Sequence, residues 1–131
     1  MWKAIFAAFM TAVAAKLFVL DVVIADGNSM EPTIRSGSVL VVNRLQYGLR
    51  FPGMKGHVAR WANPREGDVV VFLAPSGDIA VKRVGGLVCP GADGERPMFM
   101  AVGDNSRLSL DSRSFGPVSV DAVIGRVLGV R

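Results

Sequence analysis

A long apolar segment at the amino terminus sets the strongest limit on how this chain can fold. Residues 4–25 are almost wholly apolar, and Lys16 and Asp21 are the charged side chains among them. As one helix this segment would extend about 33 Å, which is enough to cross the hydrocarbon core of a bilayer. We therefore predict a transmembrane anchor helix over residues 1–25, followed by one domain over residues 26–131.

Two other structures fit the same segment. One is a cleaved secretory signal, although Ser29 follows it closely, and the other is a helix that lies in the membrane interface. A charge near the middle of a bilayer costs about 2.5–3.5 kcal/mol, so Lys16 has to reach a headgroup or a partner. Lys3 precedes the segment, whereas Asp26 and Glu31 follow it. The positive-inside tendency then predicts that the domain faces outward.

After Pro32 the apolar residues occur in short runs of the kind that form strands. A loop of turn-forming residues, 74–78, separates two of these runs and predicts a hairpin. We expect no amphipathic helix here. The expected fold class is all-β, a partly open antiparallel barrel or folded sheet, with residues 44–64 as an excursion from its core. The expected strands are 39–43, 69–73, 79–84, 98–102 and 123–130.

The scarcity of cysteine and histidine limits the metal sites and disulfides that this chain can form. The chain has one cysteine, Cys89, and one histidine, His57. A single cysteine cannot form an intramolecular disulfide, and this pair is too small for a tetrahedral zinc site. We therefore expect no metal and no cofactor.

Residues 32–65 form a basic stretch that contains neither Asp nor Glu. Apolar and aromatic residues are interleaved with its cations, a mixture that suits an anionic lipid surface. The same mixture can stack on single-stranded nucleic acid, or it can be an ordinary solvated strand face. Because the apolar segment favours a membrane, we predict lipid as a partner and no nucleic acid. The cations are Arg35, Arg44, Arg50, Lys55, Arg60 and Arg65.

Ser29 and Lys82 are the candidate reactive pair. Ser29 lies in a turn-forming context in which Gly27 permits unusual backbone angles and Pro32 fixes the exit direction. A serine hydroxyl is a poor nucleophile until a neighbouring base takes its proton. Lys82 lies in an expected strand beside Val81, where burial would lower the pKa of its amine. A neutral amine could accept the serine proton and return it to a leaving amine.

Four segments, in order, resemble the bacterial type I signal peptidases, which are membrane-anchored serine proteases that remove leader sequences from exported proteins. The resemblance covers about residues 26–128. The segments are Gly27–Thr33 (GNSMEPT), Glu66–Phe72 (EGDVVVF), Val81–Gly86 (VKRVGG), and Gly103–Val118, which contains GDN, SLDSR and FGPV.

The resemblance implies a role for each matching residue. It implies that Ser29 is the nucleophile and Lys82 the general base. It further implies that Ser109 hydrogen-bonds the lysine amine and orients it, while Asp111 and Arg113 form a supporting ion pair.

The resemblance also implies an oxyanion hole that includes the backbone N–H of Ser29. Some family members carry a hydroxyl donor at the position of Gly27, so the second donor is unassigned in this chain. The family prefers small residues, chiefly alanine, at the first and third positions before the cut. We expect shallow pockets near residues 27–30 and 79–81, with the substrate bound as an added strand.

By this resemblance, the protein would be a single-pass protein of the bacterial inner or plasma membrane, with its catalytic domain on the periplasmic or extracellular side. Its partners would be the signal peptides of preproteins. Two other functions stay open: a related Ser-Lys maturation peptidase of a conjugation system, and a catalytically inactive membrane-anchored binding module. A histidine-based hydrolase would need His57, which lies outside all four segments.

Overall fold

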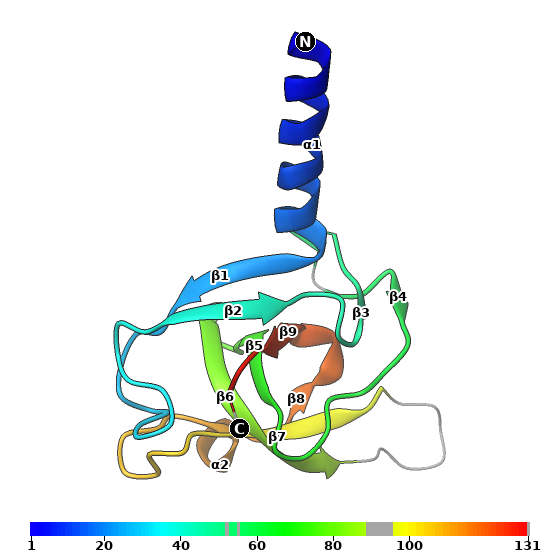
Figure 1. Ribbon diagram of the computed structural model, residues 1–131. Coiled ribbons are helices and arrows are strands. Elements are labelled where there is room, and N and C mark those ends of the chain that lie inside the picture. Colours follow the sequence, from blue (N-terminus) through cyan, green and yellow to red (C-terminus); the bar gives the residue numbers. More distant parts are fainter. Residues whose placement is uncertain (52, 55, 89–95, 131) are drawn as a thin grey trace.

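A helix projects from one end of a curled antiparallel sheet (Figure 1). The computed structural model describes residues 1–51, 53–54, 56–88 and 96–130. Cys89 and Lys55 lie outside the described residues.

The apolar amino-terminal segment forms two elements instead of one helix. Helix α1 (Trp2–Phe18) ends well before Ala25, and strand β1 (Leu20–Ile24) follows it. The prediction of one helix through residue 25 is therefore wrong, and the sheet domain begins at β1. Successive β-branched residues after Val19 favour extended structure, and β1 pairs along its whole length with β2 (Val39–Asn43). Within the described ranges, the structure has no helix long and apolar enough to cross a membrane.

The main sheet has the strand order β1-β2-β9-β5-β6-β7-β8, and all neighbouring strands are antiparallel. The all-β prediction is confirmed, and so is the hairpin at 74–78, where the N–H of Ala74 donates to the carbonyl of Asp78. Sequence reasoning missed β1 and the short β8. The remaining strands are β5 (Val69–Leu73), β6 (Ile79–Val88), β7 (Met98–Val102), β8 (Val118–Ser119) and β9 (Val123–Val127).

The excursion at 44–64 forms a separate two-stranded sheet of β3 (Gly48–Leu49) and β4 (Ala59–Arg60). Arg50 fastens it to the domain, because its buried guanidinium donates to the carbonyls of Met54 and Ala122. The short helix α2 (Ser112–Phe115) follows β7, and the 3-10 helix η1 (Val120–Ala122) lies between β8 and β9.

In the part of the chain that the structure describes, two hydrophobic clusters form the core. One surrounds Phe72 and Phe99, whose rings pack edge to face, and the other surrounds Val42 and Val71. Central strand β5 contributes to both clusters, which explains its unbroken apolar sequence.

Among the described residues, strand β6 has one edge without a partner strand over its first residues. Ile79–Arg83 pair with β5, but pairing with β7 begins only at Arg83. The backbone of residues 79–82 is therefore available on that side to another extended segment.

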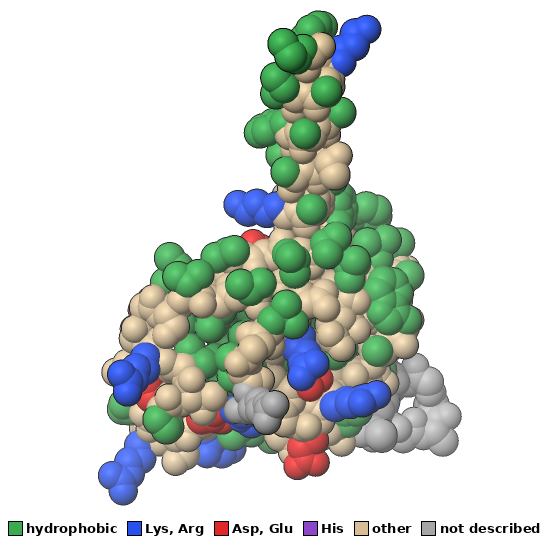
Figure 2. Space-filling view, viewed as in Figure 1, with side chains coloured by type: hydrophobic (Ala, Val, Ile, Leu, Met, Phe, Trp, Pro, Cys, Tyr) green, Lys and Arg blue, Asp and Glu red, His purple; other side chains and the backbone are tan. Residues whose placement is uncertain are grey.

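Hydrophobic side chains cover α1 and the adjoining end of the domain (Figure 2). On the outer face of the β1–β2 ribbon, Val22, Ile24 and Val39 are each more than half exposed. An apolar surface of this kind marks an interaction site.

Candidate functional site

The structure brings Ser29 and Lys82 into contact, although 53 positions separate them in the chain. Nζ of Lys82 lies 2.6 Å from Oγ of Ser29. Ser29 follows β1 in a turn segment, whereas Lys82 is part of β6. The curl of the sheet therefore brings the two segments together and sets the distance between the two side chains.

The surroundings of Lys82 favour a neutral amine. Lys82 is 7% exposed. This burial lowers the pKa of its amine, whereas the negative charge of Asp111 acts to raise it. Burial has the larger effect because the charged form loses its hydration. Such an amine can accept a proton from a hydroxyl within hydrogen-bond distance.

Asp111 is fully buried beneath the site and is held by donors on several sides. It accepts hydrogen bonds from the backbone N–H of Gly103 at 2.8 Å, from Oγ of Ser109 at 2.8 Å and from Nε of Arg113 at 2.9 Å. Burial alone would raise the pKa of the Asp111 carboxyl, but the bonds from Arg113, Gly103 and Ser109 together hold this pKa well below its usual range. The carboxylate is therefore a fixed negative charge.

Ser109 does not make the bond that the resemblance implied. Its hydroxyl donates to Asp111, and no hydrogen bond joins Ser109 to the amine of Lys82 among the described residues. The buried carboxylate is the stronger acceptor, because bonds to ionised groups are about twice as strong as neutral ones.

Gly103 brings the Asp111 segment against the serine loop. A Cβ atom at this position would lie 2.7 Å from the backbone oxygen of Ser29 and even closer to the side chain of Ser109. Only glycine allows this approach without displacing one of the two serines. Sequence reasoning gave Gly103 no role, although it lies in one of the four matching segments.

A second set of bonds ties the same segments together. Asp104 accepts two bonds from the guanidinium of Arg83, both at 2.8 Å, and a bond from the hydroxyl of Thr33. The N–H of Asn105 donates to the carbonyl of Ser29 at 2.8 Å. Arg83 adjoins Lys82 in β6, so this network fixes the base and the serine loop relative to each other. In the sequence, Thr33 lies close to Ser29 and Arg83 lies next to Lys82, each within a matching segment. This closeness was the sequence signal for the network.

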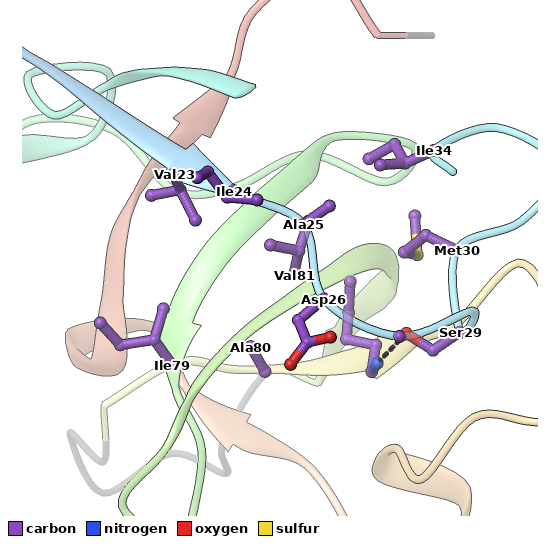
Figure 3. A pocket seen from close by; sticks show the side chains of 12 residues that line it. Val23, Ile24, Ala25, Asp26, Ser29, Met30, Ile34, Ile79, Ala80 and Val81 are labelled. Carbon is purple, nitrogen blue, oxygen red and sulfur yellow. Dashed lines mark hydrogen bonds between the residues drawn. The ribbon is translucent and has the colours of Figure 1, made fainter. Parts of the chain in front are cut away.

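A cavity of about 200 Å³ extends away from the pair, between the end of β1 and the start of β6. In Figure 3 Ser29 lies at one end of it, and Val23 and Ile79 lie at the other. Both segments expected to line a pocket, 27–30 and 79–81, contribute to its wall. Apolar side chains such as Val81 line it together with the carboxylate of Asp26. With the β6 edge that is unpaired among the described residues, it suits an extended peptide with small side chains.

The backbone around Ser29 leaves its N–H available. Gly27 adopts a positive φ of 79°, which glycine tolerates without strain. The N–H of Ser29 donates to no group in the part of the chain that the structure describes, so it can face an oxyanion. Gly27 supplies no side-chain donor, and the second donor stays unassigned.

The same described ranges contain no cluster of His, Cys, Asp and Glu that could hold a metal ion. His57 lies outside the reactive pair, within the excursion, where its ring is close to Gly48. The side chains that meet at Ser29 are thus those of acid–base and nucleophilic chemistry.

Comparison with known proteins finds relatives of this chain. A family model described as signal peptidase, peptidase S26, matches residues 1–93. The chain is 29% identical over 129 residues to signal peptidase I of Pseudomonas fluorescens, which covers 97% of this chain and 40% of that protein. It is 28% identical over 164 residues to signal peptidase I of Bacillus caldolyticus, with 93% and 85% covered.

A third relative comes from a eukaryote. The chain is 33% identical over 125 residues to mitochondrial inner membrane protease subunit 1 of Xenopus tropicalis, which covers 84% of this chain and 68% of that protein. The matched part spans 40% of the Pseudomonas fluorescens protein and 31% of a further relative, signal peptidase I of Pseudomonas aeruginosa, so the chain covers less than half of either.

Proposed function

Because the chain belongs to the signal peptidase family, peptidase S26, we propose that it is a serine endopeptidase that removes signal peptides from exported preproteins. The observation that carries this proposal is the 2.6 Å contact between Nζ of Lys82 and Oγ of Ser29. A nucleophile within hydrogen-bond distance of a buried base is the arrangement that acyl transfer requires.

In the proposed reaction Oγ of Ser29 attacks the carbonyl carbon of the scissile peptide bond and gives its proton to the neutral amine of Lys82. The C–N bond then breaks, and Lys82 returns the proton to the leaving amine. Water hydrolyses the acyl ester, with Lys82 again taking a proton and returning it to Ser29. The free N–H of Ser29 supports the developing oxyanion, and one such donor is typically worth about 3–4 kcal/mol.

Asp111, Ser109 and Arg113 act as positioning residues in this proposal. Asp111 holds the hydroxyl of Ser109 and the N–H of Gly103 in place. Arg113 in turn pairs with Asp111, and Asp111 caps α2 by accepting a hydrogen bond from the backbone N–H of Arg113. Their effect on the reaction is therefore indirect, through the placement of Ser29 and Lys82.

The substrate binds as a strand along the unpaired edge of residues 79–82, and its small side chains enter the cavity of about 200 Å³ beside Ser29. Limited volume favours alanine at the first and third positions before the cut. Main-chain hydrogen bonds along the edge supply affinity that does not depend on sequence.

We place the protein at the exporting bacterial membrane, with the domain on its outer side. Support comes from the exposed apolar side chains of α1 and of the adjoining sheet, and from a relative named as an inner membrane protease. The exposed cations Arg35 and Arg65 of the basic stretch would add attraction to anionic lipid of about 1 kcal/mol each. Arg50 is buried, and Arg44 and Arg60 form ion pairs within the domain.

The test uses the full chain in detergent with an exported-protein precursor that carries alanine at the first and third positions before its cut. We expect one cleavage product by mass spectrometry, no product with Ser29→Ala or Lys82→Met, and an unchanged rate with Ser36→Ala, which alters an exposed serine seven residues later. Full activity of Lys82→Met would rule out the dyad. Cleavage of pilin precursors alone would favour the conjugation peptidase, and no cleavage at all would favour the inactive module.

A further inference from the structure

A second cavity lies against Lys82, and the proposed reaction does not use it. Its volume is about 360 Å³. The hairpin loop between β5 and β6 forms one wall. The rest of its lining comes from Ala80 and Lys82 of β6 and from Leu110, Ser114 and Phe115.

The two cavities adjoin at β6, because Ala80 and Lys82 contribute to both. They differ in that Ile79 and Val81 line the cavity beside Ser29 and are not among the described residues that line the second cavity. Successive side chains of a strand point to opposite faces. In agreement, Ala80 packs against the core cluster around Phe72, and Val81 packs against the other cluster.

A peptide that adds to the free edge of residues 79–82 must alternate in the same way. When its first and third residues before the cut face the cavity beside Ser29, its second residue faces the side of Ala80 and Lys82. We infer that the second cavity is a subsite for an apolar side chain two positions before the cut. This inference rests on the proposed function, because the Ser29–Lys82 pair sets the register of the peptide.

The wall of the second cavity indicates the chemistry of its occupant. Leu110, Phe115 and Ala80 present apolar surface, and the volume exceeds that of the cavity beside Ser29. Leucine, methionine or phenylalanine can therefore enter. The carboxylate of Asp78, in the hairpin loop, adds a negative charge to the wall. An acidic side chain would be desolvated there beside the carboxylate of Asp78. Among the described lining residues its one cationic partner would be the amine of Lys82, which must stay neutral to act as a base.

A peptide series tests the inference on the unmodified full chain in detergent. The peptides carry alanine at the first and third positions before the cut and differ only at the second position, which is alanine, leucine or aspartate. We expect kcat/KM for the leucine peptide to exceed that for the aspartate peptide at least about tenfold. Equal rates would overturn the inference. A parallel series at the first position after the cut should show less discrimination, and a preference confined to that position would also overturn the inference.

Two variants with matched chemistry locate the effect. Leu110→Asp places a charge on the cavity wall, whereas Leu108→Asp places the same charge two residues earlier, outside the cavity. Both leucines are mostly exposed, 74% and 63%, so both variants should fold. Leu110→Asp should abolish the preference for leucine and favour a lysine peptide, and Leu108→Asp should retain the wild-type preference. A leucine preference that survives in Leu110→Asp counts against the subsite.

The outcomes separate this inference from the function on which it rests. If the wild-type chain cleaves no peptide of the series, the proposed function fails and the subsite fails with it. If cleavage requires Ser29 but does not depend on the second residue before the cut, the proposed function stands and the subsite alone is refuted.

Discussion

Replacing Gly103 by alanine should damage the site while leaving the chain folded. The added Cβ would lie 2.7 Å from the backbone oxygen of Ser29 and closer still to the side chain of Ser109. Gly103 does not have a positive φ, so the cost is steric and not conformational. Overpacking of this kind typically costs about 1–3 kcal/mol, less than the 5–15 kcal/mol by which most domains are stable.

The effect on catalysis should be larger than the effect on stability. Relief of the contact has to move the Ser29 loop or the Ser109 segment, and a misplacement of about 1 Å can lower a rate about 100-fold. We expect kcat/KM on the precursor to fall by about this factor, while the melting temperature falls by several degrees.

Gly56→Ala is the matched control, because the nearest atom to its Cβ in the described part of the chain, apart from its chain neighbours, would be Cβ of Asp121 at 3.9 Å. Its kcat/KM should stay within about twofold of wild type. Wild-type kinetics in Gly103→Ala would refute the argument that this close approach positions the nucleophile.

Three further predictions concern charge. The kcat/KM of the wild type should rise with pH as Lys82 loses its proton, with an apparent pKa below the ordinary lysine value of 10.5, because burial lowers it; a midpoint at or above that value would contradict the burial argument. Lys82→Met should be more stable than wild type at neutral pH, because the folded state disfavours the protonated amine of Lys82. Urea titrations should show this difference in the free energy of unfolding closing as the pH rises from the folded-state pKa of Lys82 to 10.5. A difference that does not depend on pH would count against the burial of a protonated amine. Asp111→Asn should cost about 2–4 kcal/mol at pH 7, since its amide would face the N–H of Gly103 and the hydroxyl of Ser109. That difference should shrink in acid, as the pH falls below 3.8 toward the lowered pKa of Asp111; a constant difference would be the contrary result.

The sheet was largely predictable because most of its strands are short apolar runs, which indicate buried strands. Val69–Leu73 and Met98–Val102 are bounded by turn formers and were found at their expected limits. The failure at β1 has a physical cause. An apolar residue is equally suited to a helix in lipid and to a strand on a hydrophobic core, so composition could not locate the change of structure at Val19. Only the pairing with β2, a non-local interaction, decides it.

The site was predictable as a set of residues but not as a network. The resemblance pointed to Ser29 and Lys82, and the structure brings their side chains together. It could not indicate that the hydroxyl of Ser109 turns to Asp111, because the direction of a hydroxyl depends on which acceptor lies nearer in space. Nor could spacing predict that Asp104 joins Arg83 to Thr33 across the fold.

The open edge of β6 also limits the positions at which a bound peptide can be cut in error. A peptide that slides along residues 79–82 by one residue would swap the sides on which all its side chains fall, whereas a slide by two would restore the original sides. Errors of processing should therefore keep the parity of the correct site. Minor products with ends displaced by two residues should outnumber those displaced by one.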